Sequence, residues 1–138
     1  MYERILLAVD GSEHAVKAAA QGAALAKLCG AEVLVFHARE LGLGARAGAF
    51  PLEGSQDALD LVNGVVHDLK EQGVTARGEA RSAPAGRVAP EILDAAGTFR
   101  ADLIVMGSRG LSDFAGLLLG SVAHKVIHHA DRPVLVVR

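Results

Sequence analysis

The sequence has one cysteine, no tryptophan, few aromatic residues and almost no excess of either charge. Cys29 alone excludes an internal disulfide, and its place in the alanine-rich "AALAKLCG" favours a small buried helix residue over a reactive thiol. A formal net charge of -2 provides no basic surface for nucleic acid or an anionic membrane. No apolar run reaches the roughly 18 residues of a membrane-spanning helix, and the N-terminal residues lack a signal-peptide cleavage pattern. We therefore expect a cytoplasmic protein that binds neither nucleic acid nor membrane.

The chain is instead rich in apolar residues and glycine. Its 138 residues fit one ordinary domain, and a hydrophobic content of 51% is enough for one packed core. The sequence contains no internal repeat and no change of composition that would mark a linker. We therefore expect residues 1–138 to form a single domain.

Short apolar segments alternate with helical patterns along the chain. Residues 4–9, 32–37, 102–106 and 133–137 have the branched, apolar composition of buried parallel strands. Residues 74–80 alternate small or apolar residues with polar ones, which is typical of a partly solvated edge strand. Helices are predicted over residues 12–30, 57–72, 87–96 and 120–129, the first capped by Ser12 and ended by Gly30. In the later helices the positions predicted to face inward are Leu59, Val62, Val66, Leu69, Val88, Ile92, Leu93, Val122, Val126 and Ile127.

This alternation predicts an α/β fold: an open, doubly wound sheet of five parallel strands with helices on both faces. We expect the Rossmann-like or flavodoxin-like type with strand order 3-2-1-4-5, in which ligands bind beyond the carboxyl ends of the strands. Residues 41–55 interrupt the alternation with four glycines and a proline, and they are predicted to form a mobile surface loop.

Glycine is concentrated after the fourth apolar segment. Gly107 and Gly110 follow the strand directly, nine residues separate Gly110 from Gly120, and Ser121 begins the next helix. A helix N-terminus presents unpaired N–H groups and a positive dipole end, and glycine has no Cβ to keep a phosphate away. The pattern therefore favours an anion site, although the same glycines could serve only turns and a helix start.

Other chemistries have weaker support in the sequence. No glycine in this stretch is followed by the lysine of a P-loop, and residues 42–48 are one residue too long for a dinucleotide-binding G-x-G-x-x-G. A phospho-acceptor receiver domain shares the fold class but needs an acidic residue after the third strand, which "EARS" does not supply. His124 and His128 lie four residues apart on one helix, yet no third zinc ligand is apparent, so solvated histidines at a helix end are favoured.

The stretch "GSRG", followed by nine residues and "GS", resembles the signature G-x2-G-x9-G-[ST] of the universal stress protein family in its ATP-binding branch. The surrounding C-terminal residues and the N-terminal "ILLAVDGSEHA" resemble the same family. One departure is Arg132, where a small residue often precedes the last strand in the family.

The resemblance implies an adenine nucleotide, ATP or a related one, lying across the carboxyl ends of the first and fourth strands. Asp10 would accept hydrogen bonds from ribose hydroxyls or from water around a metal, and main-chain groups at His37 and Ala38 would pair with the adenine edge, so that the identity of their side chains matters less. Mg²⁺ would be shared through phosphate oxygens, because no dedicated ligand cage is present. The implied nucleotide-binding residues are Ala8, Val9, Asp10, Ser12, His37, Ala38, Met106, Gly107, Arg109, Gly110, Gly120, Ser121 and Val122.

Several of these residues also have simpler roles open to them. Asp10 could only start a turn, Arg109 could be a solvated loop charge, and Ser121 could be a helix cap without a ligand. The favoured interpretation is a regulatory nucleotide-binding module of the stress response, in which ATP shifts residues 40–55 and 108–119 and so changes dimer or partner affinity. A slow Mg-dependent ATP hydrolase and an interaction module with a vacant pocket stay as alternatives, and no residue is marked as a catalytic base.

The last apolar segment predicts a partner. A strand at the end of the chain that is apolar on both faces is an unprotected sheet edge, and such edges associate. We expect a homodimer in which Pro133 to Val137 pair antiparallel with the same residues of a second copy, as the family resemblance also implies.

Overall fold

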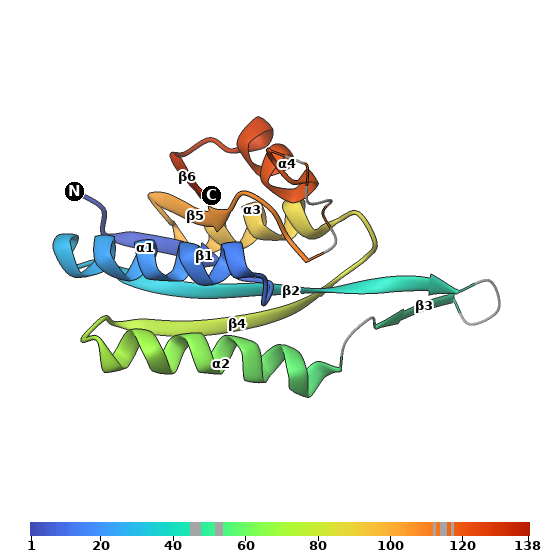
Figure 1. Cartoon of the computed structure of the whole chain (residues 1–138), viewed down its shortest axis with the longest axis horizontal. Helices are drawn as coiled ribbons and strands as arrows, with labels where there is room; N and C mark the ends of the chain where they lie inside the picture. Colours follow the sequence, from blue (N-terminus) through green and yellow to red (C-terminus); the bar gives the residue numbers. More distant parts are fainter. Residues whose placement is uncertain (45–47, 52–53, 112, 114–115, 117) are drawn as a thin grey trace.

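The computed structural model describes residues 1–138 except 45–47, 52–53, 112, 114–115 and 117 (Figure 1). The strands are β1 (Arg4–Ala8), β2 (Glu32–Gly44), β3 (Gly48–Pro51), β4 (Ala76–Ala83), β5 (Leu103–Gly107) and β6 (Val134–Val137). The helices are α1 (Glu13–Cys29), α2 (Ser55–Glu71), α3 (Val88–Phe99) and α4 (Ser121–His129). None of the helices so described is long and apolar enough to cross a membrane.

Parallel strands form the main sheet, with β4, β2, β1, β5 and β6 side by side in that order. Counted along the chain, this is the predicted order 3-2-1-4-5, so the predicted fold class is confirmed. β1 lies at the centre, where Ile5 pairs with Val33 of β2 on one side and with Leu103 of β5 on the other. The order reverses between β1 and β5, which is where folds of this type bind ligands.

Each face of the sheet has its own apolar core. Ile5 and Leu7 pack on the face covered by α1 and α2, whereas Leu6 packs with Ile92 and Val126 on the face covered by α3 and α4. All three β1 side chains are fully buried. The strand is therefore apolar on both faces, as its composition predicts.

The caps of α1 are those that the sequence predicts. The Ser12 hydroxyl accepts a hydrogen bond from the Ala15 N–H at 3.2 Å, and Gly30 ends the helix in the left-handed conformation with φ of 67°. Three finer expectations were wrong: Leu59 and Ile127 are exposed, and Cys29 is half-buried. Small residues account for part of this, because Ala58 and Ala123 take the inward positions beside Val62 and Val126.

The predicted loop at 41–55 is wrong in its described parts. β2 continues to Gly44 and pairs antiparallel with β3, from Leu41 opposite Pro51 to Gly44 opposite Gly48. Figure 1 shows this two-stranded ribbon projecting beyond the body of the sheet. β2 is paired with β4 as far as Glu40, and its backbone stays extended beyond that point, through Gly42 and Gly44, to form the ribbon. Residues 45–47 and 52–53 of the predicted loop lie outside the described residues.

Arg132 is the residue that departs from the family pattern. Its side chain connects the segment before β6 to the end of α3. Its guanidinium donates hydrogen bonds to the carbonyl oxygens of Ala96 at 2.8 Å and Ala101 at 2.9 Å. Its side chain is 19% exposed, whereas its ion-pair partner Asp131 is 78% exposed. The hydrogen bond from Arg132 lowers the pKa of Asp131.

We expect Arg132→Ala to lower the free energy of unfolding by about 1–3 kcal/mol, because two main-chain carbonyls lose a charged donor. Urea denaturation followed by circular dichroism measures this change. Asp131→Ala is the matched control and should have a much smaller effect, because that ion pair is solvated. Equal effects of the two substitutions would show that the carbonyl contacts of Arg132 do not stabilise the fold.

Candidate functional site

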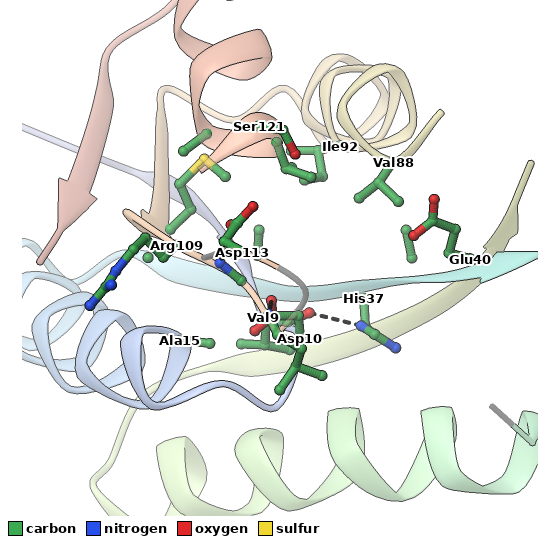
Figure 2. Close-up of a pocket in the computed structure, with 18 of the residues that line it drawn as sticks. Val9, Asp10, Ala15, His37, Glu40, Val88, Ile92, Arg109, Asp113 and Ser121 are labelled. Atoms are coloured by element: carbon green, nitrogen blue, oxygen red, sulfur yellow. Dashed lines mark hydrogen bonds between the residues drawn. The ribbon is translucent and has the colours of Figure 1, made fainter. Parts of the chain in front are cut away.

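A pocket of about 320 Å³ opens beyond the carboxyl ends of β1 and β5 and beside residues 36–40 of β2, on the face of the sheet that carries α3 and α4 (Figure 2). Of the residues implied by the family resemblance, all but Ser12 and Gly120 line it. Ser12 is adjacent as the cap of α1, with its hydroxyl 3.5 Å from the Arg109 carbonyl oxygen. Gly120 is the N-cap of α4 and precedes Ser121, which does line the pocket. The structure thus brings the predicted residues together around one cavity.

At one end of the pocket, two glycines lie directly against carboxylate side chains. A Cβ on Gly110 would approach Asp10 Oδ2 to 2.6 Å, and a Cβ on Gly120 would collide with the Asp113 carboxylate. Gly120 begins α4 without a side-chain cap, so the first N–H groups of the helix face this end of the site. We call this region, formed by Gly110, Gly120 and the N-terminus of α4, the glycine cradle. The N–H groups of Ser121 and Val122 in this region can receive an anion.

Asp10 connects the loops on either side of the cradle. Its Oδ1 accepts from the Ser12 N–H at 2.9 Å, and its Oδ2 accepts from the Leu111 N–H at 3.2 Å. The carboxylate therefore holds the turn before α1, which is the simpler role considered from sequence, and it also lines the pocket. One carboxylate serves both the local turn and the wall of the site.

The Arg109 side chain lies against α1. Its guanidinium donates to Nε2 of His14, with the Nε and Nη2 atoms at 3.4 and 3.2 Å. Figure 2 shows this side chain directed away from Asp113 and the cradle. An approach of the guanidinium to a phosphate would therefore need a different rotamer from the one present here.

The other end of the pocket is apolar. Phe36 and Ala38 of β2 form one wall, and Val88 and Ile92 of α3 form the other. Glu40 stands at this end, and its Oε1 accepts from the Gly86 N–H at 3.1 Å. A flat apolar group such as an aromatic ring fits between these two walls.

Main-chain groups of Ala38 also face the pocket. Glu32 donates its N–H to Glu3, and Phe36 accepts from Val9, so the even-numbered residues of β2 direct their main-chain groups toward β1. β1 ends at Ala8, whose partner is Phe36. The N–H and C=O of Ala38 thus have no β1 residue opposite them and form a donor and acceptor pair beside the apolar walls.

The His37 side chain fixes the edge of the site. The ring is buried, and its Nδ1 donates to the Val9 carbonyl oxygen at 2.8 Å. Val9 in turn donates its N–H to the Phe36 carbonyl oxygen. Sequence reasoning valued only the main chain at His37, but the side chain ties the end of β2 to the end of β1.

Arg81 of β4 anchors α3 beside the apolar end. Its guanidinium contacts Glu91, Asp94 and Glu79, all at 2.8 to 2.9 Å, and lies over the ring of Phe36. The hydrogen bond to Glu91 is the largest of the effects that raise the pKa of Arg81. The network pairs two carboxylates of α3, the helix whose apolar side chains line the pocket, with one cation.

Sequence reasoning missed several lining residues as members of the site. Phe36 and Glu40 could have been found, because they share a face of β2 with Ala38 by the period of two. Val88 and Ile92 were predicted to face inward, but only as core residues. The other missed lining residues are Ala15, Leu111, Asp113 and Ala123; Asp113 lies in the nine-residue spacer of the signature, whose sequence the motif leaves free.

Among the described residues, no group of three or more His, Cys, Asp or Glu side chains is arranged to hold a metal ion. His124 and His128 stack with ring centroids 6.3 Å apart on α4, and His129 meets His128 edge-on.

The chain is thus a doubly wound α/β protein with a pocket at the switch point of its sheet. The model of the universal stress protein family matches residues 1–138, so the chain belongs to that family. A universal stress protein of Thermus aquaticus is 41% identical over 138 residues, covering 100% of both chains. One of Methanocaldococcus jannaschii is 36% identical over 148 residues, covering 100% of this chain and 83% of the relative.

Solved structures agree with this assignment. The universal stress protein of Archaeoglobus fulgidus has a TM-score of 0.74 at 27% identity, covering 100% of this chain and 95% of the other. Three further family structures, at 22%, 24% and 19% identity, share the fold with TM-scores of 0.70, 0.71 and 0.69. These proteins were solved in complex with cAMP, with dAMP and with AMP, the second from Archaeoglobus fulgidus and the third from Arabidopsis thaliana.

Gly107→Ala should destabilise the protein, because the new Cβ would lie 2.7 Å from His14 Cβ and 2.8 Å from the His14 carbonyl carbon. The main chain of α1 cannot yield without moving the helix, so we expect a loss of about 1–3 kcal/mol in the free energy of unfolding. Gly64→Ala on the exposed face of α2 meets nothing within 4 Å and should instead add about 0.5–1 kcal/mol. Urea denaturation of both variants measures the contrast, and a stable Gly107→Ala would show that α1 does not need this close approach.

Proposed function

We propose that the protein binds an adenine nucleotide in this pocket and acts as a regulatory module of the stress response. The observation that carries the proposal is a cavity with an apolar slot at one end and the glycine cradle at the other. A nucleotide has the same polarity, with a flat base at one end and phosphates at the other. The adenine nucleotides held by structural relatives support this choice of ligand.

Each end of the nucleotide has a chemical partner. The adenine edge offers an acceptor nitrogen and an amino donor, which match the N–H and C=O of Ala38. Asp10, midway along the pocket, can accept from ribose hydroxyls. The N–H groups of Ser121 and Val122 and the Ser121 hydroxyl are suited to phosphate oxygens at the start of α4. Main-chain recognition of this kind depends little on which side chains stand at these positions.

ATP with Mg²⁺ is the form that we favour among adenine nucleotides. The start of α4 fits an anion, and Asp10 can hydrogen-bond water around an ion that the phosphates carry. When bound, Mg²⁺ would neutralise part of the phosphate charge. We propose binding rather than turnover.

The test of nucleotide binding begins with the purified protein. Denaturation followed by mass spectrometry should release an adenine nucleotide, and calorimetry should show that Mg-ATP binds to the emptied protein. The double variant Gly110→Val, Gly120→Val should weaken Mg-ATP binding by about tenfold or more, because its side chains fill the cradle. Gly64→Ala serves as the control outside the pocket. Unchanged affinity in a folded double variant would remove the proposed role, and ADP release that Asp10→Ala abolishes would replace it with hydrolysis.

We also propose that the protein forms a homodimer through Pro133 to Val137. β6 pairs only with β5 among the described strands, and its four residues are partly exposed. The loop of the site touches this strand, because Ser108 donates its N–H to Val137 at 2.7 Å and accepts from Gly120 at 2.6 Å. Two hydrogen bonds through Ser108 therefore connect Gly120, in the cradle, to Val137 of β6, the strand of the proposed dimer interface. This connection supports nucleotide-dependent association.

Sedimentation analysis tests the dimer. Leu135→Glu places a charge on the edge strand and should convert the dimer to monomer. Val16→Glu is the matched control, because Val16 is exposed on α1, away from β6. Circular dichroism must show that both variants fold, since Leu135 also packs against the core. A wild-type protein that stays monomeric at high concentration would refute the dimer without use of any variant.

A further inference from the structure

Asp113 places a negative charge in the glycine cradle. Its Oδ2 accepts from the Gly110 N–H at 2.6 Å, and the same carboxylate lies against Gly120, where any Cβ would collide with it. Asp113 is half-buried and lines the pocket. Figure 2 shows it between Arg109 and Ser121, at the end of the site opposite Val88. A carboxylate therefore occupies the position that the proposed function gives to a phosphate.

Carboxylate and phosphate oxygens compete for the same donors. The Gly110 N–H has one proton to donate, so a ligand phosphate can receive it only after the Asp113 carboxylate moves away. A Cβ on Gly110 would also lie 2.6 Å from Asp10 Oδ2, so the carboxylates of Asp10 and Asp113 flank the cradle. Arg109 is the nearest cation along the chain, and its guanidinium is engaged with His14. A polyphosphate without a metal ion is therefore repelled by the carboxylates of Asp10 and Asp113 when it enters the cradle.

We infer that Asp113 is a specificity-determining residue that disfavours metal-free polyphosphates and makes the site select the divalent-metal complex of its nucleotide. The inference rests on the proposed nucleotide-binding function. A metal ion cancels part of the phosphate charge and gives the displaced carboxylate a cation to face. The repulsion grows with the charge of the ligand, so it acts strongly on ATP without metal, weakly on Mg-ATP and not on adenosine.

Asp113→Asn tests this inference with little change of shape, because the amide oxygen can still accept from Gly110. Calorimetry compares wild type and variant with four probes: adenosine, ATP in EDTA, Mg-ATP and inorganic tripolyphosphate. We expect Asp113→Asn to bind metal-free ATP and tripolyphosphate about fivefold more tightly or better, with adenosine unchanged within about twofold. The preference for Mg-ATP over metal-free ATP should fall by about fivefold. Raising the salt concentration should reduce the difference between the two proteins.

Two controls separate charge in the cradle from other effects. Asp60→Asn removes the same charge from the exposed face of α2 and should leave all four affinities unchanged. Asp113→Glu keeps the charge and should keep the preference for the metal complex. An unchanged preference in Asp113→Asn, or an equal gain for adenosine, overturns the inference while nucleotide binding stands. If neither wild type nor Asp113→Asn binds any probe, the proposed function and this inference fail together.

Discussion

The site depends on the shortness of the central strand. β1 ends at Ala8, whereas β2 continues past Phe36 and β5 continues to Gly107. Because β2 and β5 extend further than β1, which lies between them, the sheet has a notch at its carboxyl edge beyond the end of β1. The chain leaving β1 is then held at its rim, by Phe36 at the Val9 N–H and by His37 at the Val9 carbonyl. The pocket is a consequence of this strand pairing rather than of a separate binding element.

Close packing around the notch needs residues without bulk. The main chain of α1 reaches the end of β5 only because Gly107 has no Cβ, and α2 reaches β4 in the same way at Gly78, where a Cβ would collide with Val62. Alanine on the inner face of α1, with Gly22 against Leu7, keeps that helix near the sheet. Alanine and glycine thus allow α1 and α2 to pack closely on one face of the sheet, and Gly110 and Gly120 lie at the pocket on the other face.

Local and periodic features of the sequence were enough to predict the order of the sheet. β1 and β5 are apolar on both faces, and Ser12 and Gly30 have chemistry that only helix ends use well. The glycine signature predicted where the cradle lies, because glycines at a fixed spacing can be recognised in the sequence itself. Contacts that depend on tertiary distance were not predictable: Glu40 reaches Gly86, Arg109 turns to His14, and Arg132 caps α3. The β2–β3 ribbon was missed because glycines in the segment weaken its strand signal, although its pairing with β4 already sets the direction of β2.

The contact between the cradle and the edge strand sets a thermodynamic condition on any regulatory role. Ser108 is buried and joins Gly120 to Val137 through its own N–H and C=O, so the two regions share one main-chain unit. If a ligand binds the two association states of the proposed dimer with different affinities, its occupancy changes the free energy of association at β6, and association changes ligand affinity by the same factor. A ligand that binds both association states equally tightly would shift neither, however strong its binding. Regulation through this pocket would therefore require a difference in ligand affinity between the two states, and both Ser108 and the pairing of Met106 and Gly107 with β6 connect the pocket to that edge.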